Sequence, residues 1–341
     1  MLTDRQIMVL KAIVEEFTQT ALPVGSRVLS KKQELKFSAA TIRNDMADLE
    51  ELGFLEKTHT SSGRVPSQQG YRFYVDNIIS KVALPASEET IVFDQLLTQK
   101  QFERETAVKE AMKLLSSLTN YTSILLGPSW QNCRVQKIQF VPISYVQAVL
   151  ILITDHGHVE SRTITLPQGI STQMMEKIIK ALDELLAGIL VSEVQDRLAS
   201  GFESHLHDFV SYKEEIVFAM LQLLSQSMQN SNVVLSGRSN MLRQPDFGDV
   251  TQVSSLFEMM EQNEFVKAIE TIDTSQRQLT VRIGQENEIK AMENCTLITV
   301  PYQIGDSEYG KIALLGPTRM EYQKIIPLLE HVARMMSDLY K

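Results

Sequence analysis

The feature that most constrains this chain is the stretch Ser38–Leu55, which has the pattern of a capped helix that runs into a strand. Ser38 is a favoured N-cap residue, and Gly53 is a favoured residue just past a helix C-terminus. Between them, Ile42 and Leu49 recur at helical spacing and indicate one buried stripe. The stretch therefore predicts a short amphipathic helix whose other face is available for binding.

The residues on that other face are of the types that read DNA bases. Arg43 can bind guanine with both arms of its guanidinium, and Asn44 can pair with adenine. Small residues beside them let a helix enter the major groove deeply, and the N-terminal half of a recognition helix makes the base contacts. The alternative is an ordinary amphipathic helix in a core. The residues expected to face DNA are Ala40, Thr41, Arg43, Asn44 and Ala47.

The neighbouring segments complete a winged helix-turn-helix. Thr3 to Gln19 has helical periodicity with a capping-box pattern at its start. Ser26 is expected to cap a short helix that ends at about Leu35. After the recognition helix, Phe54–Thr60 and Arg64–Pro66 predict a two-stranded ribbon, or wing, and Ser67 caps a further helix. The order of three helices and a ribbon predicts a DNA-binding domain over 1–80.

The net charge of the whole chain is unusual for a DNA-binding protein, but the distribution of charge along the chain supports DNA binding. The chain has a net charge of −9, yet residues 1–80 hold as many Lys and Arg as Asp and Glu, so the rest of the chain carries the whole excess. Within 26–43, basic residues outnumber the single acid Glu34. A local basic patch can bind phosphates while an acidic body limits non-specific adhesion.

Phosphate contacts are expected from the second helix and from the wing. Basic and hydroxyl side chains in these positions orient a protein on DNA without choosing its sequence. For the lysines the alternative is a solvated helix face, and for the histidine it is an ordinary surface position. The second helix supplies Ser26, Arg27, Lys31 and Lys32, and the wing supplies Lys57, His59, Thr60, Ser62 and Arg64.

The remainder of the chain predicts an α+β protein of several domains. Residues 81–102 have the composition of a linker. Strand-like and helical runs alternate over 103–189 and return over 276–341, whereas 190–275 is mostly helical. We therefore expect an α+β domain, made of 103–189 and 276–341, that is interrupted by a helix-rich insertion at 190–275.

No set of residues typical of an enzyme or a metal site emerges. Gly305–Lys311 has the spacing of a phosphate-binding loop, but Ile312 replaces the hydroxyl residue that holds magnesium, and a strand follows instead of a helix. A hairpin turn is expected there. Two His-x-His pairs, at 156–158 and 205–207, lack a nearby cysteine. We expect no catalytic residue, no metal and no cofactor.

The cysteines and the hydropathy favour a cytoplasmic protein. Cys133 and Cys295 form neither a disulfide framework nor a CxxC site, and two such thiols fit a reducing compartment. The first residues lack the pattern of a signal peptide, and no apolar run reaches the length of a membrane span.

Two separated groups of motifs resemble the family of heat-inducible transcription repressors called HrcA. The resemblance extends over essentially the whole chain and is weakest over 190–275. The motifs that carry it are Pro23–Ser26, Ser38–Met46, Leu49–Leu55 and His59–Pro66 in the N-terminal part, and Arg282–Asn287 and Gly316–Tyr322 in the C-terminal part.

The resemblance implies a function and a set of partners. A member of this family is expected to repress the GroE and DnaK chaperone operons by binding an inverted-repeat operator, the CIRCE element, as a homodimer. The GroE chaperonin is expected to keep it active, and heat to relieve repression. The resemblance also implies that 103–189 with 276–341 is a GAF-like domain and that 190–275 is an inserted dimerisation domain.

Two other classes of function remain open from the residues alone. The order of a DNA-binding module followed by an α+β module is also typical of a regulator gated by a small molecule, with the α+β domain as sensor. An enzyme is the most distant alternative, because no catalytic set is found.

Overall fold

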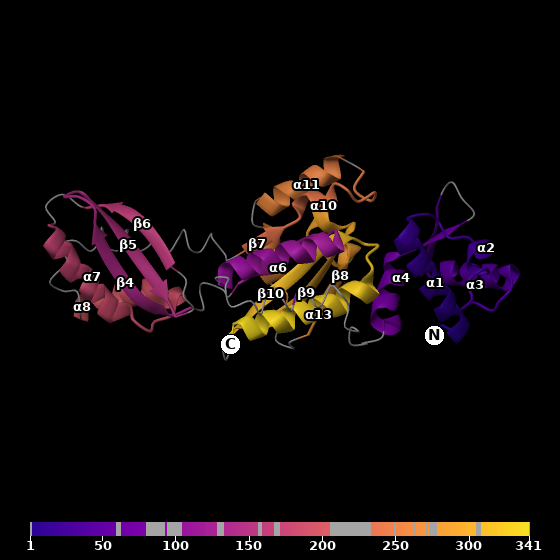
Figure 1. Cartoon of the computed structure of the whole chain (residues 1–341), viewed down its shortest axis with the longest axis horizontal. Coiled ribbons are helices and arrows are strands. Elements are labelled where there is room, and N and C mark those ends of the chain that lie inside the picture. The colour runs from indigo at the N-terminus through magenta and orange to yellow at the C-terminus, as the bar shows by residue number, and fades with distance from the viewer. Residues whose placement is uncertain are drawn as a thin grey trace. The chain divides into compact units, whose positions relative to one another are not determined.

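The computed structural model contains two compact units, Met1–Leu125 with Val234–Lys341 and Leu126–Val233 (Figure 1). No described helix is long and apolar enough to cross a membrane. The structure describes residues 2–58, 63–79, 93, 104–127, 133–155, 159–166, 171–204, 233–248, 250–261, 264–270, 272, 278–304 and 308–340.

The first unit begins with three helices: α1 (Asp4–Thr20), α2 (Ser26–Leu29) and α3 (Ala39–Glu51). The capping box expected at the start of α1 is confirmed, because Thr3 accepts a hydrogen bond from the Gln6 amide and the Gln6 side chain bonds back. Helix α2 is shorter than expected. Its residues adopt helical geometry only to Leu29, and turns follow.

A two-stranded antiparallel ribbon follows α3, formed by β1 (Leu55–Lys57) and β2 (Arg64–Pro66). Helix α4 (Gln68–Phe73) comes next, and Ser67 caps it by accepting from the Gly70 amide, as expected. The chain then continues as one π-helical segment, Tyr74–Ile78. This order matches the order of elements that the sequence predicts for the N-terminal part.

The C-terminal part of the first unit contains a five-stranded sheet with strand order β7-β3-β10-β9-β8. Strands β9 and β10 form a long antiparallel hairpin in which Ile304 pairs with Glu308, so the hairpin expected around 305–311 is confirmed. The strands are β3 (Thr122–Leu126), β7 (Val233–Ser236), β8 (Thr280–Ile283), β9 (Cys295–Ile304) and β10 (Glu308–Pro317).

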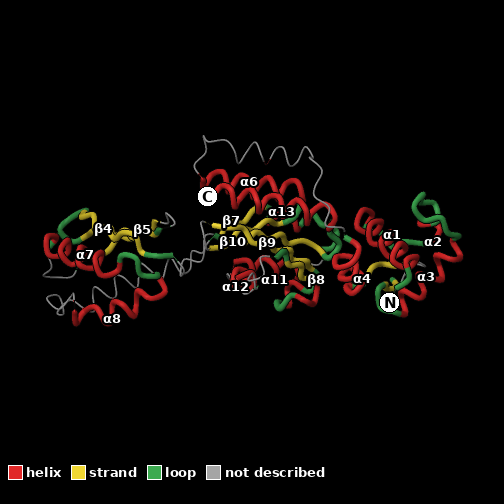
Figure 2. The backbone as a smooth tube through the Cα atoms, turned by 90° about the horizontal axis from the view of Figure 1, so that it is seen from below, coloured by secondary structure: helices red, strands yellow, loops and turns green. Residues whose placement is uncertain are grey.

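Helices cover both faces of this sheet (Figure 2). Helices α6 (Arg104–Thr119) and α13 (Tyr322–Leu339) lie on one face, and α11 (Val250–Glu261) and α12 (Glu264–Glu270) lie on the other. The short helix α10 (Arg238–Met241) follows β7. Pro327 lies inside α13 without dividing it.

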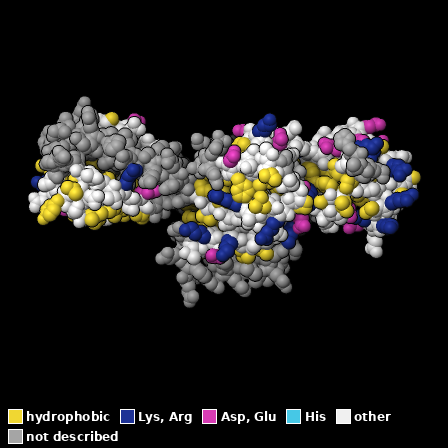
Figure 3. Space-filling model, turned by 90° about the horizontal axis from the view of Figure 1, so that it is seen from above, with side chains coloured by type: hydrophobic (Ala, Val, Ile, Leu, Met, Phe, Trp, Pro, Cys, Tyr) yellow, Lys and Arg dark blue, Asp and Glu magenta, His cyan; other side chains and the backbone are white. Residues whose placement is uncertain are grey.

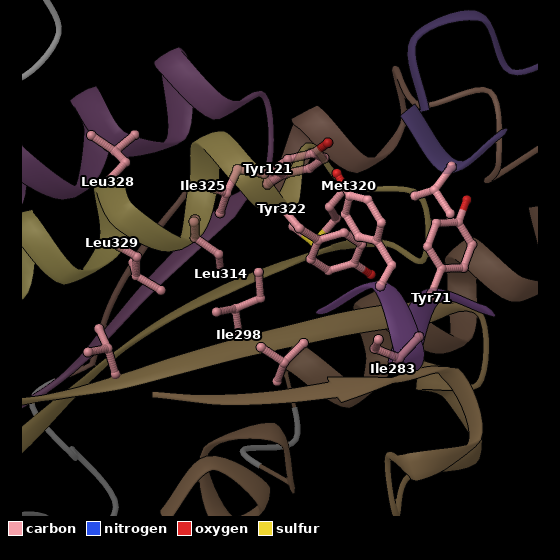
Figure 4. Packing of buried hydrophobic residues seen from close by; sticks show 14 of the residues in the cluster. Tyr71, Tyr121, Ile283, Ile298, Leu314, Met320, Tyr322, Ile325, Leu328 and Leu329 are labelled. Carbon is pink, nitrogen blue, oxygen red and sulfur yellow. The ribbon is translucent and has the colours of Figure 1, made fainter. Parts of the chain in front are cut away.

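The space between α13 and the sheet is filled by apolar side chains (Figure 4). Leu329 of α13 packs toward Ile298 of β9 and Leu314 of β10, and all three are fully buried. Burying side chains of this size stabilises a fold by about 1.5–3 kcal/mol each. The cluster also includes buried residues of α1 and α3.

The second unit has a sheet of its own. Strands β4 (Val135–Pro142), β5 (Gln147–Thr154) and β6 (Val159–Thr165) form an antiparallel meander. Helix α7 (Thr172–Leu186), capped by Ser171, packs its apolar face against one side of this sheet. The short segment Val191–Glu193 and helix α8 (Val194–Ser204) follow.

The extents of the compact units differ from the expected domain extents. The sequence-based expectation joins 135–166 to the C-terminal strands and places the insertion at 190–275. In the structure β4, β5 and β6 pair only with one another among the described strands, whereas β7, α11 and α12 belong to the first unit. Strand periodicity identifies a strand but does not say which sheet it joins.

Candidate DNA-binding interface

Helix α3 presents the face that the sequence predicts. Arg43 and Asn44 are exposed, and so are Ala40 and Ala47. The opposite stripe is buried, with Ile42 and Leu49 fully so. Four of the five residues expected to face DNA therefore lie on the accessible side of a helix whose other side is fixed in the core.

Both ends of α3 are held by local hydrogen bonds. The Ser38 hydroxyl accepts from the Thr41 amide at 3.1 Å and lies 2.9 Å from the Thr41 hydroxyl, so Thr41 is half-buried and already engaged at the cap. At the other end Gly53 has φ +81° and donates to Glu50, while the Phe54 amide donates to Leu49. These two bonds satisfy carbonyls that a helix end leaves without partners.

A buried carboxylate that the sequence reasoning did not single out fixes α3 against α1. Asp45 is 1% exposed and receives two hydrogen bonds from Arg5, at 2.7 Å and 2.9 Å. The hydrogen bond and the charge of Asp45 raise the pKa of Arg5 above its ordinary value. A signal existed in the sequence, because Asp45 lies three residues after Ile42, on the core-facing stripe.

The basic patch next to α3 is only partly free. Arg27 and Lys31 are exposed, but Lys32 forms an ion pair with Glu16 at 2.7 Å. Ser26 is a correction to the expectation. It is buried, and Gly25 occupies the N-cap position, so Ser26 neither caps α2 nor offers its side chain to a phosphate. Lys and Arg side chains gather over the N-terminal helices in Figure 3.

The ribbon is attached to the helices by its second strand. The Arg64 backbone exchanges two hydrogen bonds of 2.9 Å with Val24. The Arg64 guanidinium pairs with Glu50 at 2.6 Å and is mostly buried, whereas Lys57 is exposed. Three further residues of the expected set, His59, Thr60 and Ser62, lie outside the described residues.

The sequence patterns that partly match a phosphate-binding loop or a metal site do not form such sites in the described residues. Lys311 lies in strand β10, and its ammonium group donates to the carbonyls of Ile269 and Ile272 at 2.9 Å and 2.8 Å. The described residues contain no cluster of three His, Cys, Asp or Glu side chains that could hold a metal. Both His-x-His pairs lie outside the described residues.

Comparison with known proteins identifies the family. The family model described as "HrcA protein C terminal domain" matches residues 105–326. A curated relative from Bacillus pumilus (strain SAFR-032), described as a heat-inducible transcription repressor HrcA, is 43% identical over 99% of this chain and 98% of its own length. The chain belongs to the HrcA family. Members of the HrcA family are transcription repressors rather than enzymes, which agrees with the residues.

A solved structure supports the fold of this HrcA chain. A crystal structure described as a hypothetical protein has a TM-score of 0.67 and 25% sequence identity, covering 100% of this chain and 99% of the other. The family model and the curated relative confirm the resemblance of the sequence motifs to the HrcA family.

Proposed function

We propose that this chain represses heat-shock chaperone operons of the GroE and DnaK classes by binding an inverted-repeat operator, CIRCE, as a homodimer in the cytoplasm. The observation that carries the proposal is the exposed Arg43 and Asn44 on the first half of α3, held by the Ser38 cap and the buried Asp45. In this proposal residues 1–80 form a winged helix-turn-helix.

Base reading falls to α3. Arg43 binds guanine and Asn44 binds adenine in the major groove, and the small side chains Ala40 and Ala47 allow close approach. The acids of the last turns, Asp48, Glu50 and Glu51, then lie away from the groove. The engaged Thr41 contributes its methyl group rather than its hydroxyl.

Phosphate binding falls to α2, its following turn and the ribbon. Arg27, Lys31 and Lys57 are exposed and can reach the DNA backbone directly. Lys32 and Arg64 are paired with glutamates, so they contribute to the potential of the surface more than through direct contacts. His59, Thr60 and Ser62 complete the proposed wing set.

A homodimer follows from the size of the site. One recognition helix reads few base pairs, and a two-fold symmetric pair doubles the site on an inverted repeat. We place the dimer contact on the compact unit Leu126–Val233 instead of on the insertion expected at 190–275. Exposed apolar side chains of this unit support this, among them Tyr145 at 95% and Val146 at 60% exposure.

The GroE chaperonin is proposed to keep the repressor active, so that heat-damaged clients withdraw the chaperonin and relieve repression. This step rests on family membership. The five-stranded sheet β7-β3-β10-β9-β8 with helices on both faces supports a GAF-like description of the C-terminal part of the first unit, although 135–186 of the expected domain belongs to the second unit. Apolar side chains fill the space between α13 and this sheet (Figure 4), and this packing does not favour the alternative of a small-molecule ligand.

A gel-shift assay tests the proposal. The full chain is titrated onto a labelled fragment with the inverted repeat and onto the same fragment with one half-site scrambled, with and without chaperonin, at two temperatures. We expect the chain to retard the fragment with the intact inverted repeat, and to retard it more when chaperonin is present. We expect this specific retardation to be lost when one half-site is scrambled. Equal affinity for both fragments would contradict operator recognition.

A further inference from the structure

Two C-terminal motifs that carry the family resemblance lie against the N-terminal part, although the proposed DNA contacts do not include them. The motif Arg282–Asn287 contacts helix α4. Arg72 of α4 forms an ion pair with Glu286, with a hydrogen bond from Nε at 2.8 Å, and donates to the Val281 carbonyl at 2.6 Å. The contact therefore joins segments more than two hundred residues apart.

Gly284 is the point of closest approach in this contact. It has φ +56°, and a Cβ there would overlap the side-chain amide of Gln68. That amide accepts from the Gln285 backbone at 3.2 Å and donates to the Glu293 carbonyl at 3.3 Å. The backbone conformation favours glycine here, and a larger residue would displace the Gln68 amide from its two hydrogen bonds.

The second motif, Gly316–Tyr322, contacts helices α1 and α4. Arg319 is 9% exposed, its Nε lies 2.8 Å from both carboxylate oxygens of Asp246, and its Nη1 donates to the Thr18 carbonyl at 3.1 Å. The rings of Tyr71 and Tyr322 lie 6.1 Å apart at their centroids, and both are labelled in Figure 4.

The Arg319 contact lies at a helix end. Thr18 lies in the last turn of α1, where carbonyls lack helical partners, and that turn contains no basic residue. A positive charge at this position is favoured by the helix dipole. Helix α1 ends in an αL cap at Ala21, whose amide donates to the Phe17 carbonyl, and Arg319, paired with Asp246, adds a hydrogen bond from the C-terminal part to the Thr18 carbonyl.

We propose that the motifs Arg282–Asn287 and Gly316–Tyr322 form a docking seat that fixes the orientation of the DNA-binding part, residues 2–79, and that Arg72 and Arg319 are its positioning residues. The seat holds α1 and α4, which in turn carry α3. In a symmetric dimer this seat fixes the recognition helix of each protomer against its own sheet and is thus one determinant of the spacing of half-sites. The role in spacing rests on the proposed function, whereas the docking itself does not.

Hydrogen exchange on the full chain tests the docking without DNA. Arg72→Gln and Glu286→Gln should each speed amide exchange in α4 and β8 by about tenfold, a change of 1.4 kcal/mol in local opening. Because both remove the same contact, the double variant should exchange no faster than the faster single variant. Lys113→Gln, which removes an exposed ion pair with Glu110 on α6, is the matched control. Unchanged exchange in the single variants, or additive effects in the double variant, would overturn the docking seat.

Operator spacing tests the positioning. The chain is titrated onto inverted repeats whose half-sites are moved apart by one base pair at a time through about half a helical turn, or five base pairs. The wild type should lose about tenfold or more in affinity at the wrong spacing, and Arg72→Gln should flatten this profile. A profile that Arg72→Gln leaves unchanged, with exchange altered, would overturn the positioning role. If the wild type bound none of these inverted repeats, whatever their spacing, the proposed function would be refuted, and the hydrogen-exchange result on docking would still hold.

Discussion

Replacement of Arg43 by alanine should weaken operator binding without weakening the fold. The side chain is exposed on the first half of α3, and no described residue forms an ion pair or side-chain hydrogen bond with it. Exposed substitutions of this kind change the free energy of unfolding by about 0.5 kcal/mol or less. A urea denaturation curve of Arg43→Ala should therefore overlay that of the wild type.

The expected loss in binding follows from one base contact per protomer. A two-pronged arginine–guanine contact discriminates by about 1–3 kcal/mol, or roughly 5- to 150-fold in Kd. In a symmetric dimer both copies of α3 lose the contact, so the total loss is about 2–6 kcal/mol if the half-sites contribute independently. A scrambled fragment should lose much less, because only the charge is missing there.

Fluorescence anisotropy at one fixed salt concentration measures both affinities. Arg334→Ala, which removes an exposed arginine from α13, is the matched control and should leave both unchanged. If Arg43→Ala bound the operator as tightly as the wild type, α3 would not read bases through this residue. If it lost affinity equally for operator and scrambled DNA, Arg43 would be a phosphate contact.

Four further outcomes are expected. Lys31→Ala should reduce the slope of log K against log salt by about one unit per protomer, and an unchanged slope would remove Lys31 from the phosphate set. Asp45→Ala should lower the urea midpoint, because α1 and α3 lose their bridge; an unmoved midpoint would contradict this role. Burial by itself would raise the pKa of Glu286, but hydrogen bonds from Arg72 and the Ile283 amide outweigh it and hold that pKa below its usual 4.5. Its stabilising effect is thus complete above pH 4.5 and lost as pH falls through the lower folded-state pKa, so Glu286→Gln should flatten the acid limb of a stability–pH curve. Burial raises the pKa of the Cys295 thiol to about 12, so at pH 8 an aromatic disulfide reagent should label it only after unfolding.

The local structure of the N-terminal part could be predicted because its signals are short-range. Ser38, Ser67 and Thr3 cap helices through bonds that span three residues, so the sequence alone contains both partners. The buried stripe of α3 follows from spacing in the same way. Helix α2 was predicted too long because the turns after Leu29 have no glycine or proline to mark them.

Long-range pairing was not predictable from these signals. Strand β3 is a short apolar run directly after helix α6, and a buried helix end has the same composition. The separate sheet β4–β5–β6 depends on which strand edges meet, which period-two patterning does not encode. The partners of Arg64 and Arg319 are likewise set by the fold, since Glu50 and Asp246 approach them only once the helices and loops are packed.

The placement of ion pairs explains how a chain of net charge −9 can present a basic DNA-binding surface. Three acids of the N-terminal part are paired internally, because Asp45 binds Arg5, Glu16 binds Lys32, and Glu50 binds Arg64. Each pair lowers the repulsion between a carboxylate and an approaching phosphate, because charges that neutralise each other contribute little to the distant potential. Among the exposed charged residues of 26–43, the four bases Arg27, Lys31, Lys36 and Arg43 then outnumber the single acid Glu34. The same packing that fixes the recognition helix therefore also determines the sign of the surface around it.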